Sequence, residues 1–483
     1  MKYIILVISI FIFTGCLNRE VEIERVNSNK IAREEKDQNI SKIENNTIKE
    51  ILIDRDNNST KNEMIDKSQT SKKLEIKDLT TIPQDVNFYL KDLDINETIY
   101  TIQNRYKQNY FRVWNSKSPS EDLKSIKWPF NAYRAEKSYG ENFQPLKQIF
   151  FDEMLLNSNF ESFATVNENA ITTKECSLRS FPTIKPLLKN PSIAGEGFPF
   201  DYLQNSSIHA NEPILISHYS LDKEWAYVFS SFASGWIKTD QFAIIEDDIS
   251  HALQEYDQIS ITKEDIPIYG DDGEFLFKSK VGMLFPLISE NGESYTILTI
   301  SSYKNSKPLY LESKILKKFA TKNILKLNRD NLSVIVGEVS RTNYGWGGIY
   351  EQRDCSSMMR DLFTPFGIWL PRNSSQQSKI GKVISLKNLT DEEKIETIKN
   401  SAVPFQTLFY KKGHIVLYAG VYNNEIIVFH NVWGIKTKKD NIEGRIVIGK
   451  PIFSTLKLGA EQENFDISSE MLRNLKSLNI ITR

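Results

Sequence analysis

The feature that most constrains the fold is a glycine-rich aromatic loop that leads into a helix beginning at a cysteine. Residues 344–348 read Tyr-Gly-Trp-Gly-Gly, and Cys355 follows shortly afterwards. After Cys355, apolar residues recur at helical spacing until Pro365, which predicts a helix over this stretch. The thiol would then lie in the first helical turn, where unpaired backbone N–H groups and the helix dipole favour a thiolate.

A strand hairpin comes later in the chain. Residues 414–430 are mostly apolar and β-branched around Asn423 and Asn424, and a histidine stands at each end, His414 and His430. A polar loop and a second helix near Asp391 separate this hairpin from the first helix. Helices first and antiparallel strands afterwards predict an α+β domain.

The two histidines can act together only if the hairpin meets a geometric condition. Side chains alternate between the faces of a strand with period two. A two-residue turn at Asn423 and Asn424 would send His414 and His430 to opposite faces. A three-residue loop or a β-bulge would place both on one face. If both imidazoles serve one site, we expect an odd-length loop or a bulge.

Cys355 and these histidines form a candidate nucleophile with its base. His414 is the better base because it begins the first strand after Gly413 and can face the start of the helix. His430, with Asn431 as the alternative, would fix the tautomer of the base. Backbone N–H groups at the helix start could form an oxyanion hole. The other readings are a cysteine buried as a small hydrophobe and a zinc site, for which paired short-spaced ligands are missing. No metal or cofactor is predicted.

The rest of the chain predicts further domains. With 483 residues the chain is long enough for about three. Residues 96–114 have helical periodicity, and from about 160 to 320 short β-runs with turn residues between them predict two small barrels. Cys176 falls in a strand-like run, so we expect a structural role and no disulfide with Cys355. The net charge of −1 gives no basic surplus for nucleic-acid binding.

The N-terminus predicts export. Residues 1–16 hold Lys2, a short apolar run and Cys16, the form of a secretion signal. Its ending Phe-Thr-Gly-Cys resembles a bacterial lipobox, which implies cleavage before Cys16 and lipidation of that cysteine. Leu17 provides no recognised signal for inner-membrane retention, so we expect the periplasmic side of the cell envelope, at the outer membrane. Residues 17–82 lack aromatic residues and glycine, as in a disordered tether.

Several of these segments resemble the NlpC-type cell-wall cysteine peptidases. They are Asp354-Cys355-Ser356 at a helix start, residues 413–420 on a strand, and His430 on the next strand. The loop at 344–348 resembles the one that these enzymes place beside the cysteine. Residues 195–205 and 218–238 resemble the first of two bacterial SH3-like barrels, which precede the peptidase in one branch of the family.

The resemblance implies a papain-like α+β peptidase domain with a Cys-His-His triad of Cys355, His414 and His430. It also implies peptidoglycan stem peptides as the substrate, cut at the bond between γ-linked D-glutamate and a diamino acid. Positions that line the family's substrate pocket are matched by Tyr344, Asp354 and Ser356.

The first barrel of this branch can restrict the cleft to stem peptides with a free N-terminal L-alanine. Glu196, Asp201 and Tyr202 lie in the stretch that matches this barrel best. Two other functions stay open: an inert peptidase fold whose barrels hold the cell wall, and a related thiol amidase or acyl transferase that acts on another murein bond.

The resulting division of the chain is a signal peptide at 1–16, a tether at 17–82, a helical N-terminal region at 83–155, a first SH3-like barrel at 156–245, a second at 246–322, the peptidase domain at 323–455 and a C-terminal tail at 456–483.

Overall fold

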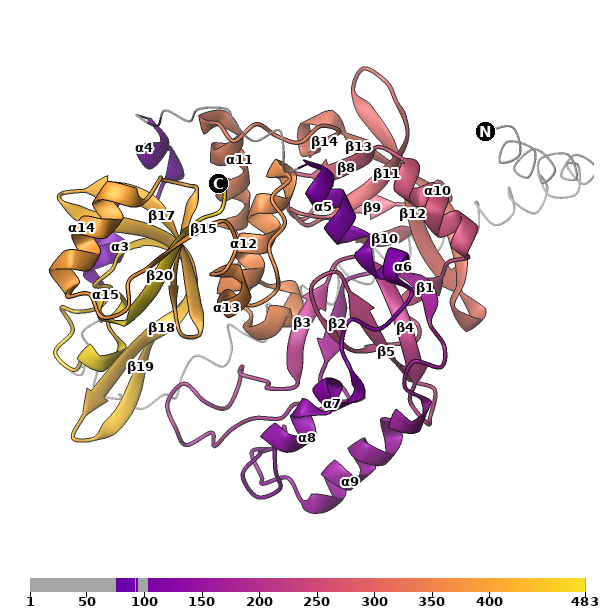
Figure 1. Ribbon diagram of the computed structural model, residues 1–483, viewed down its shortest axis with the longest axis horizontal. Helices are drawn as coiled ribbons and strands as arrows, with labels where there is room; N and C mark the ends of the chain where they lie inside the picture. Colours follow the sequence, from indigo (N-terminus) through magenta and orange to yellow (C-terminus); the bar gives the residue numbers. More distant parts are fainter. Residues whose placement is uncertain (1–74, 92, 94–102, 483) are drawn as a thin grey trace, which may run out of the picture. The chain divides into compact units, whose positions relative to one another are not determined.

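Four groups of elements follow one another along the chain, coloured in sequence order in Figure 1. The structure is a computed structural model that describes residues 75–91, 93 and 103–482. The predicted signal peptide, the lipidated Cys16 and the tether as far as residue 74 lie outside the described residues. Within the described ranges, no helix has the length and apolar character that crossing a membrane requires.

The N-terminal region is helical, as predicted. Asp78 on its first helix accepts hydrogen bonds from the backbone N–H and hydroxyl of Thr455 in the peptidase sheet, at 2.7 and 3.0 Å. The indole of Trp114 instead donates to the carbonyls of Ala170 and Ile214 in the first barrel, at 3.0 and 3.1 Å. Folded structure thus begins before residue 82, where the sequence predicted the tether to end. The helices are α3 (Lys77–Thr81), α4 (Val86–Leu90), α5 (Gln103–Tyr110), α6 (Arg112–Ser116), α7 (Leu123–Ile126), α8 (Trp128–Ala132), α9 (Gln148–Asn157) and the 3-10 turn η1 (Phe160–Ser162).

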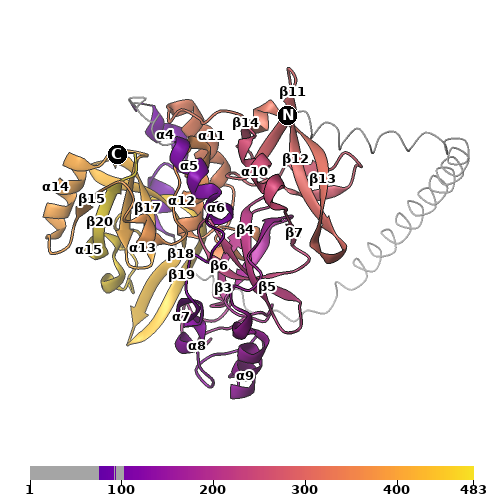
Figure 2. The ribbon, with the colours of Figure 1, turned by 45° about the vertical axis from the view of Figure 1, so that its right-hand side comes forward.

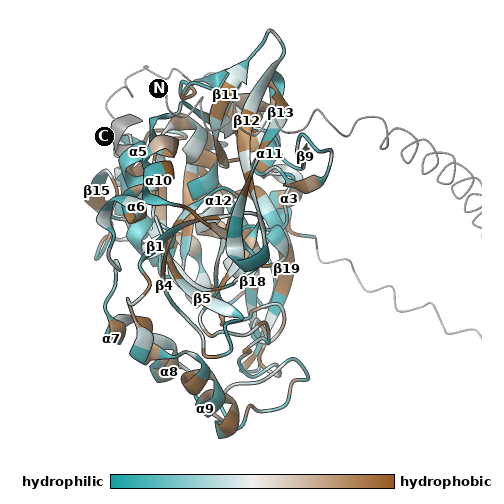
Figure 3. Cartoon of the chain, turned by 90° about the vertical axis from the view of Figure 1, so that its right-hand side faces the viewer, coloured by the Kyte–Doolittle hydropathy of each residue, from teal (hydrophilic) through white to brown (hydrophobic). Residues whose placement is uncertain are grey.

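Helix α9 packs less completely than the others. Ile149, Leu155 and Leu156 on it are exposed, and hydrophobic stretches along α9 are visible in Figure 3. The small core beneath this region is built around Phe151 and Phe181. The N-terminal region therefore depends on its contacts with the barrel for much of its packing.

The first barrel is a seven-stranded antiparallel sheet with the strand order β3-β2-β6-β5-β4-β1-β7. Its interior is fully buried at Leu178, Ile214 and Val228, as expected for short strands whose apolar faces turn inward. The strands are β1 (Glu168–Thr172), β2 (Cys176–Arg179), β3 (Gln204–Ile208), β4 (Pro213–Tyr219), β5 (Trp225–Ser230), β6 (Ser234–Lys238) and β7 (Phe242–Ile244).

The second barrel begins after helix α10 (Asp247–Glu255). Five strands run in the order β13-β12-β11-β8-β14, and β9 and β10 form a separate pair. Ile261, Phe285 and Ile297 fill its core. Two barrels were predicted, and two are present. The elements are β8 (Gln258–Ile261), β9 (Pro267–Tyr269), β10 (Phe275–Lys278), β11 (Leu284–Glu290), β12 (Ser294–Tyr303), η2 (Lys304–Ser306), β13 (Lys307–Leu316), η3 (Lys317–Phe319) and β14 (Ala320–Thr321).

The peptidase domain has helices before its main sheet, which gives the predicted α+β arrangement. Its six strands run in the order β15-β20-β16-β17-β18-β19, and Figures 1 and 2 show the sheet between α12 and α14. Leu417 and Phe429 face the α12 side, whereas Val416 and Val428 face the other core. The elements are α11 (Arg329–Val339), η4 (Trp346–Glu351), α12 (Cys355–Phe363), η5 (Thr364–Phe366), α13 (Ser374–Gln377), β15 (Lys382–Ser385), α14 (Asp391–Ser401), β16 (Thr407–Lys411), β17 (His414–Tyr422), β18 (Glu425–Lys439), β19 (Ile442–Thr455), η6 (Ile467–Ser469), α15 (Met471–Asn474) and β20 (Leu475–Ile480).

The segment 456–483 is not a separate tail. Strand β20 pairs with β15 on one side and with β16 on the other, so the end of the chain lies inside the sheet. Leu475, Leu478 and Ile480 are buried, yet they are interspersed with polar residues over only six positions. Such a short pattern is weak evidence for a strand, because its pairing with distant strands is what stabilises it.

Candidate active site

Cys355 is the first residue of α12, and Asp354 caps that helix. The Asp354 carboxylate accepts hydrogen bonds from the backbone N–H groups of Ser356 and Ser357, at 3.1 and 2.9 Å, and the Ser357 hydroxyl accepts one from the Asp354 N–H at 2.9 Å. This reciprocal capping box fixes where the helix begins. The predicted position of the thiol in the first turn is therefore confirmed.

Arg372 holds this helix start from the loop that follows η5. Its guanidinium donates to both carboxylate oxygens of Asp354, at 3.1 and 2.6 Å, and to the Ser356 hydroxyl at 3.0 Å. It also donates to the Ser206 hydroxyl of the first barrel at 2.6 Å. Burial would raise the pKa of Asp354, but Arg372 and the cap bonds outweigh it and hold the pKa below its usual value. Arg372 was missed because only the tertiary structure brings it to Asp354.

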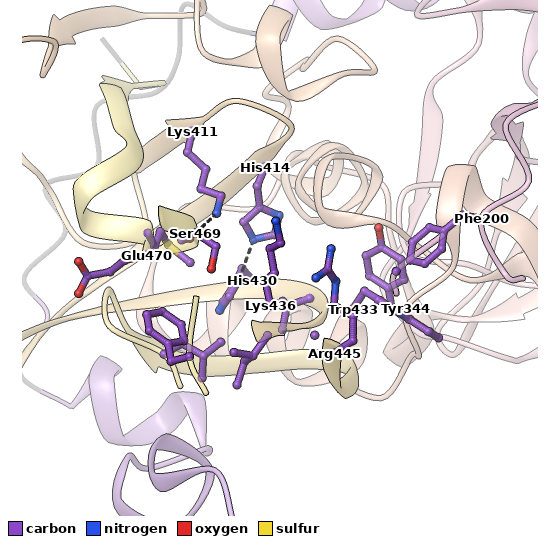
Figure 4. Close-up of a pocket in the computed structure, with 17 residues that line it drawn as sticks. Phe200, Tyr344, Lys411, His414, His430, Trp433, Lys436, Arg445, Ser469 and Glu470 are labelled. Atoms are coloured by element: carbon purple, nitrogen blue, oxygen red, sulfur yellow. Dashed lines mark hydrogen bonds between the residues drawn. The ribbon is translucent and has the colours of Figure 1, made fainter. Parts of the chain in front are cut away.

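The hairpin meets the predicted condition through a bulge. The turn has two residues, Asn423 and Asn424, both with left-handed backbone (φ of 50° and 64°). That turn alone would separate His414 and His430. The register shifts between Tyr418 and Gly420, which leaves one extra residue in β17 and restores a common face. His414 Nε2 and His430 Nδ1 lie 2.8 Å apart (Figure 4).

The hydrogen-bond chain continues to Ser454 on β19 and sets the direction of every donor. The Ser454 hydroxyl donates its proton to the Thr455 carbonyl, at 3.0 Å, so it accepts from His430 Nε2, 2.9 Å away. Neutral His430 then accepts at Nδ1 from His414 Nε2. His414 Nδ1 is left with a lone pair, which is the protonation that a base needs. Ser454 was not identified from the sequence.

The side chain of Asn431, the alternative residue for orienting His414, points toward the loop before Cys355. Its amide donates to the Arg353 carbonyl at 2.7 Å, and Gly345 N–H donates to that same carbonyl at 2.8 Å. Asn431 therefore ties β18 to the loop before Cys355. Of the two candidates, His430 is the one that contacts His414.

The thiol lies beside β17 in a buried environment. The backbone N–H groups of Ile415 and Ser356 lie close to its sulfur, and Cys355 is 7% exposed. Burial, with Asp354 adding to it, raises the pKa of Cys355 to about 12 against the effect of these amides and Arg372. Burial and the charge of Lys411 lower the pKa of His414 to about 3. Both shifts favour a neutral thiol and a neutral imidazole at rest, in contrast to the thiolate expected from the helix start alone.

Two adjoining cavities open at this site. One of about 470 Å³ is lined by Cys355 and by all three predicted pocket residues, Tyr344, Asp354 and Ser356. The other, of about 350 Å³, is lined by His414 and His430. Tyr344 lines both, so the two cavities adjoin at its side chain. Figure 4 shows Tyr344 with the lining of the cavity that holds the two histidines. Other side chains in the first cavity come from the N-terminal region, the first barrel and the peptidase, among them Glu121, Trp128, Tyr202, Trp346 and Arg372.

Glu196, Asp201 and Tyr202, the residues in the stretch that matches the first barrel best, have different surroundings in the structure. Tyr202 lines the cavity of Cys355, and its hydroxyl donates to the Glu196 carboxylate at 2.7 Å. Asp201 instead forms a buried ion pair with Arg179 at 2.6 Å. Asp201 is therefore engaged in the barrel's own structure and lies outside this cavity. Glu121, which no sequence signal indicated, places a carboxylate in it.

The two described cysteines are both free, in agreement with the expectation of no disulfide. Cys176 is buried in the first barrel. His209 and His218 are buried as well, and His209 lies between the carboxylates of Glu175 and Asp361, at 2.7 and 3.0 Å. Both histidines are therefore part of the interior of the protein.

Comparisons with known proteins agree with this arrangement. Family models match four consecutive stretches: the N-terminal stabilising domain of NlpC/P60 proteins at residues 59–163, an SH3 domain of SH3b1 type at 186–238, an SH3 domain of SH3b2 type at 251–291, and the NlpC/P60 family at 341–446. A search of curated proteins gave no match.

Solved structures include similar chains. A novel NlpC/P60 endopeptidase from Photobacterium damselae subsp. piscicida is 26% identical, over 83% of this chain and 98% of that one, with a TM-score of 0.70. An NlpC/P60 family protein from Bacillus cereus ATCC 10987 is 14% identical, over 65% of this chain and 100% of that one, with a TM-score of 0.43. The four matched domains, in this order and with the first of these structural likenesses, show that the chain belongs to the NlpC/P60 family of cell-wall peptidases, in the branch with an N-terminal stabilising domain and two SH3-like domains.

Proposed function

We propose that this protein is a cysteine endopeptidase that hydrolyses the γ-D-glutamyl–diamino acid bond of peptidoglycan stem peptides. Cys355 is the nucleophile, His414 the base and His430 the residue that orients the base. The observation that carries this proposal is the hydrogen-bond chain from His414 through His430 to Ser454. It leaves a lone pair on His414 Nδ1, at the start of the strand beside which the thiol lies.

The neutral resting pair defines the first chemical step. His414 Nδ1 takes the thiol proton as the sulfur of Cys355 attacks the γ-carbonyl carbon, since neither group is charged beforehand. The same imidazole then gives that proton to the departing amine, and a thioester between Cys355 and the γ-glutamyl group forms. Water hydrolyses the thioester with His414 again acting as the base.

The oxyanion of each tetrahedral intermediate needs donors that are not already used. Asp354 occupies the N–H groups of Ser356 and Ser357. Among the described residues, the N–H of Cys355 has no hydrogen-bond partner. We assign the oxyanion contact to the N–H of Cys355. The sequence alone predicts that several backbone N–H groups at the helix start share this role.

The cavity lined by Cys355 is suited to bind a short stem peptide with a free N-terminus. Glu121, whose carboxylate accepts from the Ser234 hydroxyl at 2.6 Å, and Tyr202 stand where the barrel closes that cavity. An ammonium group at the end of the peptide would find a carboxylate there. Ser356, next to Cys355, can bind the free α-carboxylate of the γ-linked glutamate, and Arg372, which is paired with Asp354, holds Ser356 in place.

One digest tests activity and bond choice together. Purified peptidoglycan stem peptides are incubated with the protein, and the products are identified by mass spectrometry. We expect fragments that begin with the diamino acid, and no such fragments from Cys355→Ala. Cys176→Ala is the matched control, because that cysteine is buried away from the cleft, and it keeps activity.

Other products would decide between the remaining functions. Undiminished cleavage by Cys355→Ala would refute the mechanism. Products cut at another murein bond would favour a thiol amidase, and intact peptides with wall binding retained would favour an inert scaffold.

From residues 1–16 alone we also propose that the chain is exported and lipidated at Cys16, on the periplasmic side of the cell envelope at the outer membrane. Growth with radiolabelled palmitate should label the wild type and not Cys16→Ser. Equal labelling of both would contradict the anchor.

A further inference from the structure

The cavity behind the imidazole pair carries charges that the proposed triad does not use. Among the described residues that line it, three are cationic, Lys411, Lys436 and Arg445, and one is acidic, Glu470. Figure 4 draws Lys411 and Arg445 on either side of His414 and His430. The cavity, of about 350 Å³, is therefore suited to a ligand with negative charge.

Two of the three cations have no acidic partner within ion-pair distance in the described part of the chain. The Lys411 ammonium donates to the Ser469 carbonyl at 3.1 Å, and burial lowers its pKa with no carboxylate to offset it. The Arg445 guanidinium donates to the Gly444 carbonyl at 3.0 Å, and Glu443, which pairs with Lys436, interacts with it only from beyond ion-pair distance. A partly buried cation whose hydrogen bonds go only to a carbonyl can still bind an anion.

The remaining charges are already neutralised. Lys436 forms ion pairs with Glu443 and with Asp466, the second at 3.2 Å. Glu470 pairs with Arg473 at 3.6 Å. The charge that is free to meet a ligand thus comes from Lys411 and Arg445.

The chemistry indicates which part of the substrate enters this cavity. The base returns its proton to the departing nitrogen, so that nitrogen lies beside the imidazole of His414. His414 lines this cavity, which places the leaving diamino acid there. Its α-carboxylate is one bond from the carbon that bears the departing nitrogen, and diaminopimelate has a second carboxylate at the far end of its side chain.

We infer that Lys411 and Arg445 bind the carboxylates of the leaving diamino acid, and that this pair selects a diamino acid with two carboxylates over lysine. The inference rests on the proposed function and adds the specificity of its leaving-group side. Each contact is a charge-assisted hydrogen bond made in a partly buried cavity.

The test compares three tripeptides, L-alanyl-γ-D-glutamyl followed by meso-diaminopimelate, by its bis-amide, or by lysine. The wild type should cleave the diacid with a kcat/KM about 100-fold above that for the bis-amide, with the lysine peptide between them. Lys411→Met and Arg445→Met should each lower the diacid-to-bis-amide ratio about 10-fold, and the double variant should bring it close to 1. Lys436→Met, a cation in the same cavity that already has partners, should keep the wild-type ratio.

The ratio separates recognition from structural damage, which lowers both rates together. Lys411→Gln provides a second neutral variant if the methionine variant does not fold. A wild-type ratio near 1, or a ratio that Lys411→Met and Arg445→Met leave unchanged, overturns the inference while the proposed function stands. Cleavage of none of the peptides by the wild type removes the proposed function itself.

Discussion

Ser454 decides the protonation of both imidazoles although it contacts only one of them, His430. Its hydroxyl has a single proton, which the Thr455 carbonyl accepts, so the only role left toward His430 is that of an acceptor. The direction of two histidine bonds follows from this one contact. A residue outside the proposed triad thus sets the tautomer that the proposed base needs.

Ser454→Ala should lower kcat without a matching change in KM. The substitution leaves His430 Nε2 buried without a partner, a cost of about 1–3 kcal/mol, which is relieved when the His430 ring changes tautomer and withdraws its acceptor from His414. We expect kcat to fall about 10- to 100-fold. Steady-state kinetics on a stem tripeptide check this, with thermal unfolding as the control. A kcat equal to that of the wild type would show that His414 holds its tautomer without this chain.

The buried thiol predicts a particular pH dependence of alkylation. Burial raises the pKa of Cys355 to about 12, so the thiolate fraction rises with pH throughout the neutral range. In a Cys16→Ser, Cys176→Ser background, which leaves Cys355 as the single cysteine, the rate of modification by iodoacetamide should increase about tenfold for each pH unit from 7 to 9. A rate that is already high and constant at pH 6 would instead indicate a thiolate–imidazolium pair.

At the scale of the element, the bulge in β17 is what brings His414 and His430 together. The two-residue turn and the bulge each change the face of His414, and together they return it to the side of His430. Gly420 beside the bulge has a φ of 128°, and no atom lies within 4 Å of where its Cβ would be. The glycine is therefore needed for its backbone conformation and not for space.

Gly420→Ala should affect activity more than its effect on stability suggests. Placing a side chain at this φ costs about 1–3 kcal/mol, and the strand can relieve it by moving the bulge, which rotates His414 away. We expect kcat/KM to fall at least about 10-fold. Gly273→Ala is the control, since Gly273 also has positive φ (82°) and open space but lies in the second barrel. Equal activity loss in both variants would argue against a role for the bulge. Urea unfolding measures the two stabilities.

At the scale of the whole described chain, a buried charge cluster joins both barrels to α12, the helix that begins at Cys355. His209 of the first barrel and Arg353 both contact the Asp361 carboxylate on α12, at 3.0 and 2.7 Å, and Arg353 also pairs with Glu264 of the second barrel at 2.9 Å. Burial disfavours the charged imidazole, but Glu175 and Asp361 outweigh it and raise the pKa of His209 to about 10. The barrels therefore hold α12 from behind while the cleft opens at its start.

His209→Gln should destabilise the protein by about 3 kcal/mol near pH 6, because Glu175 loses its cation and Asp361, which keeps Arg353, loses one of its cationic partners. The pKa is raised from 6.5 to about 10 on folding, so the stabilisation is complete below pH 6.5 and is lost as the pH rises toward 10. The gap between wild type and variant in urea unfolding should shrink over that range. A gap that stays constant from pH 6 to 10 would mean that His209 is neutral in the folded protein.

The sequence by itself determined the features that depend on neighbours along the chain. The cap at Asp354, the helix that starts at Cys355, the pairing condition for His414 and His430 and the two barrels all follow from local spacing and turn residues, whose energetics act over a few positions.

Only the tertiary structure decided what depends on contacts between distant segments. His414 and His430 share a face because of a bulge and not because of a longer hairpin loop. The tertiary structure also brings Arg372 and Ser454 to the site and places β20 inside the sheet. It also raised the pKa of the Cys355 thiol, because the pKa of a group depends on how deeply the surrounding elements bury it, and no spacing along the chain encodes that depth.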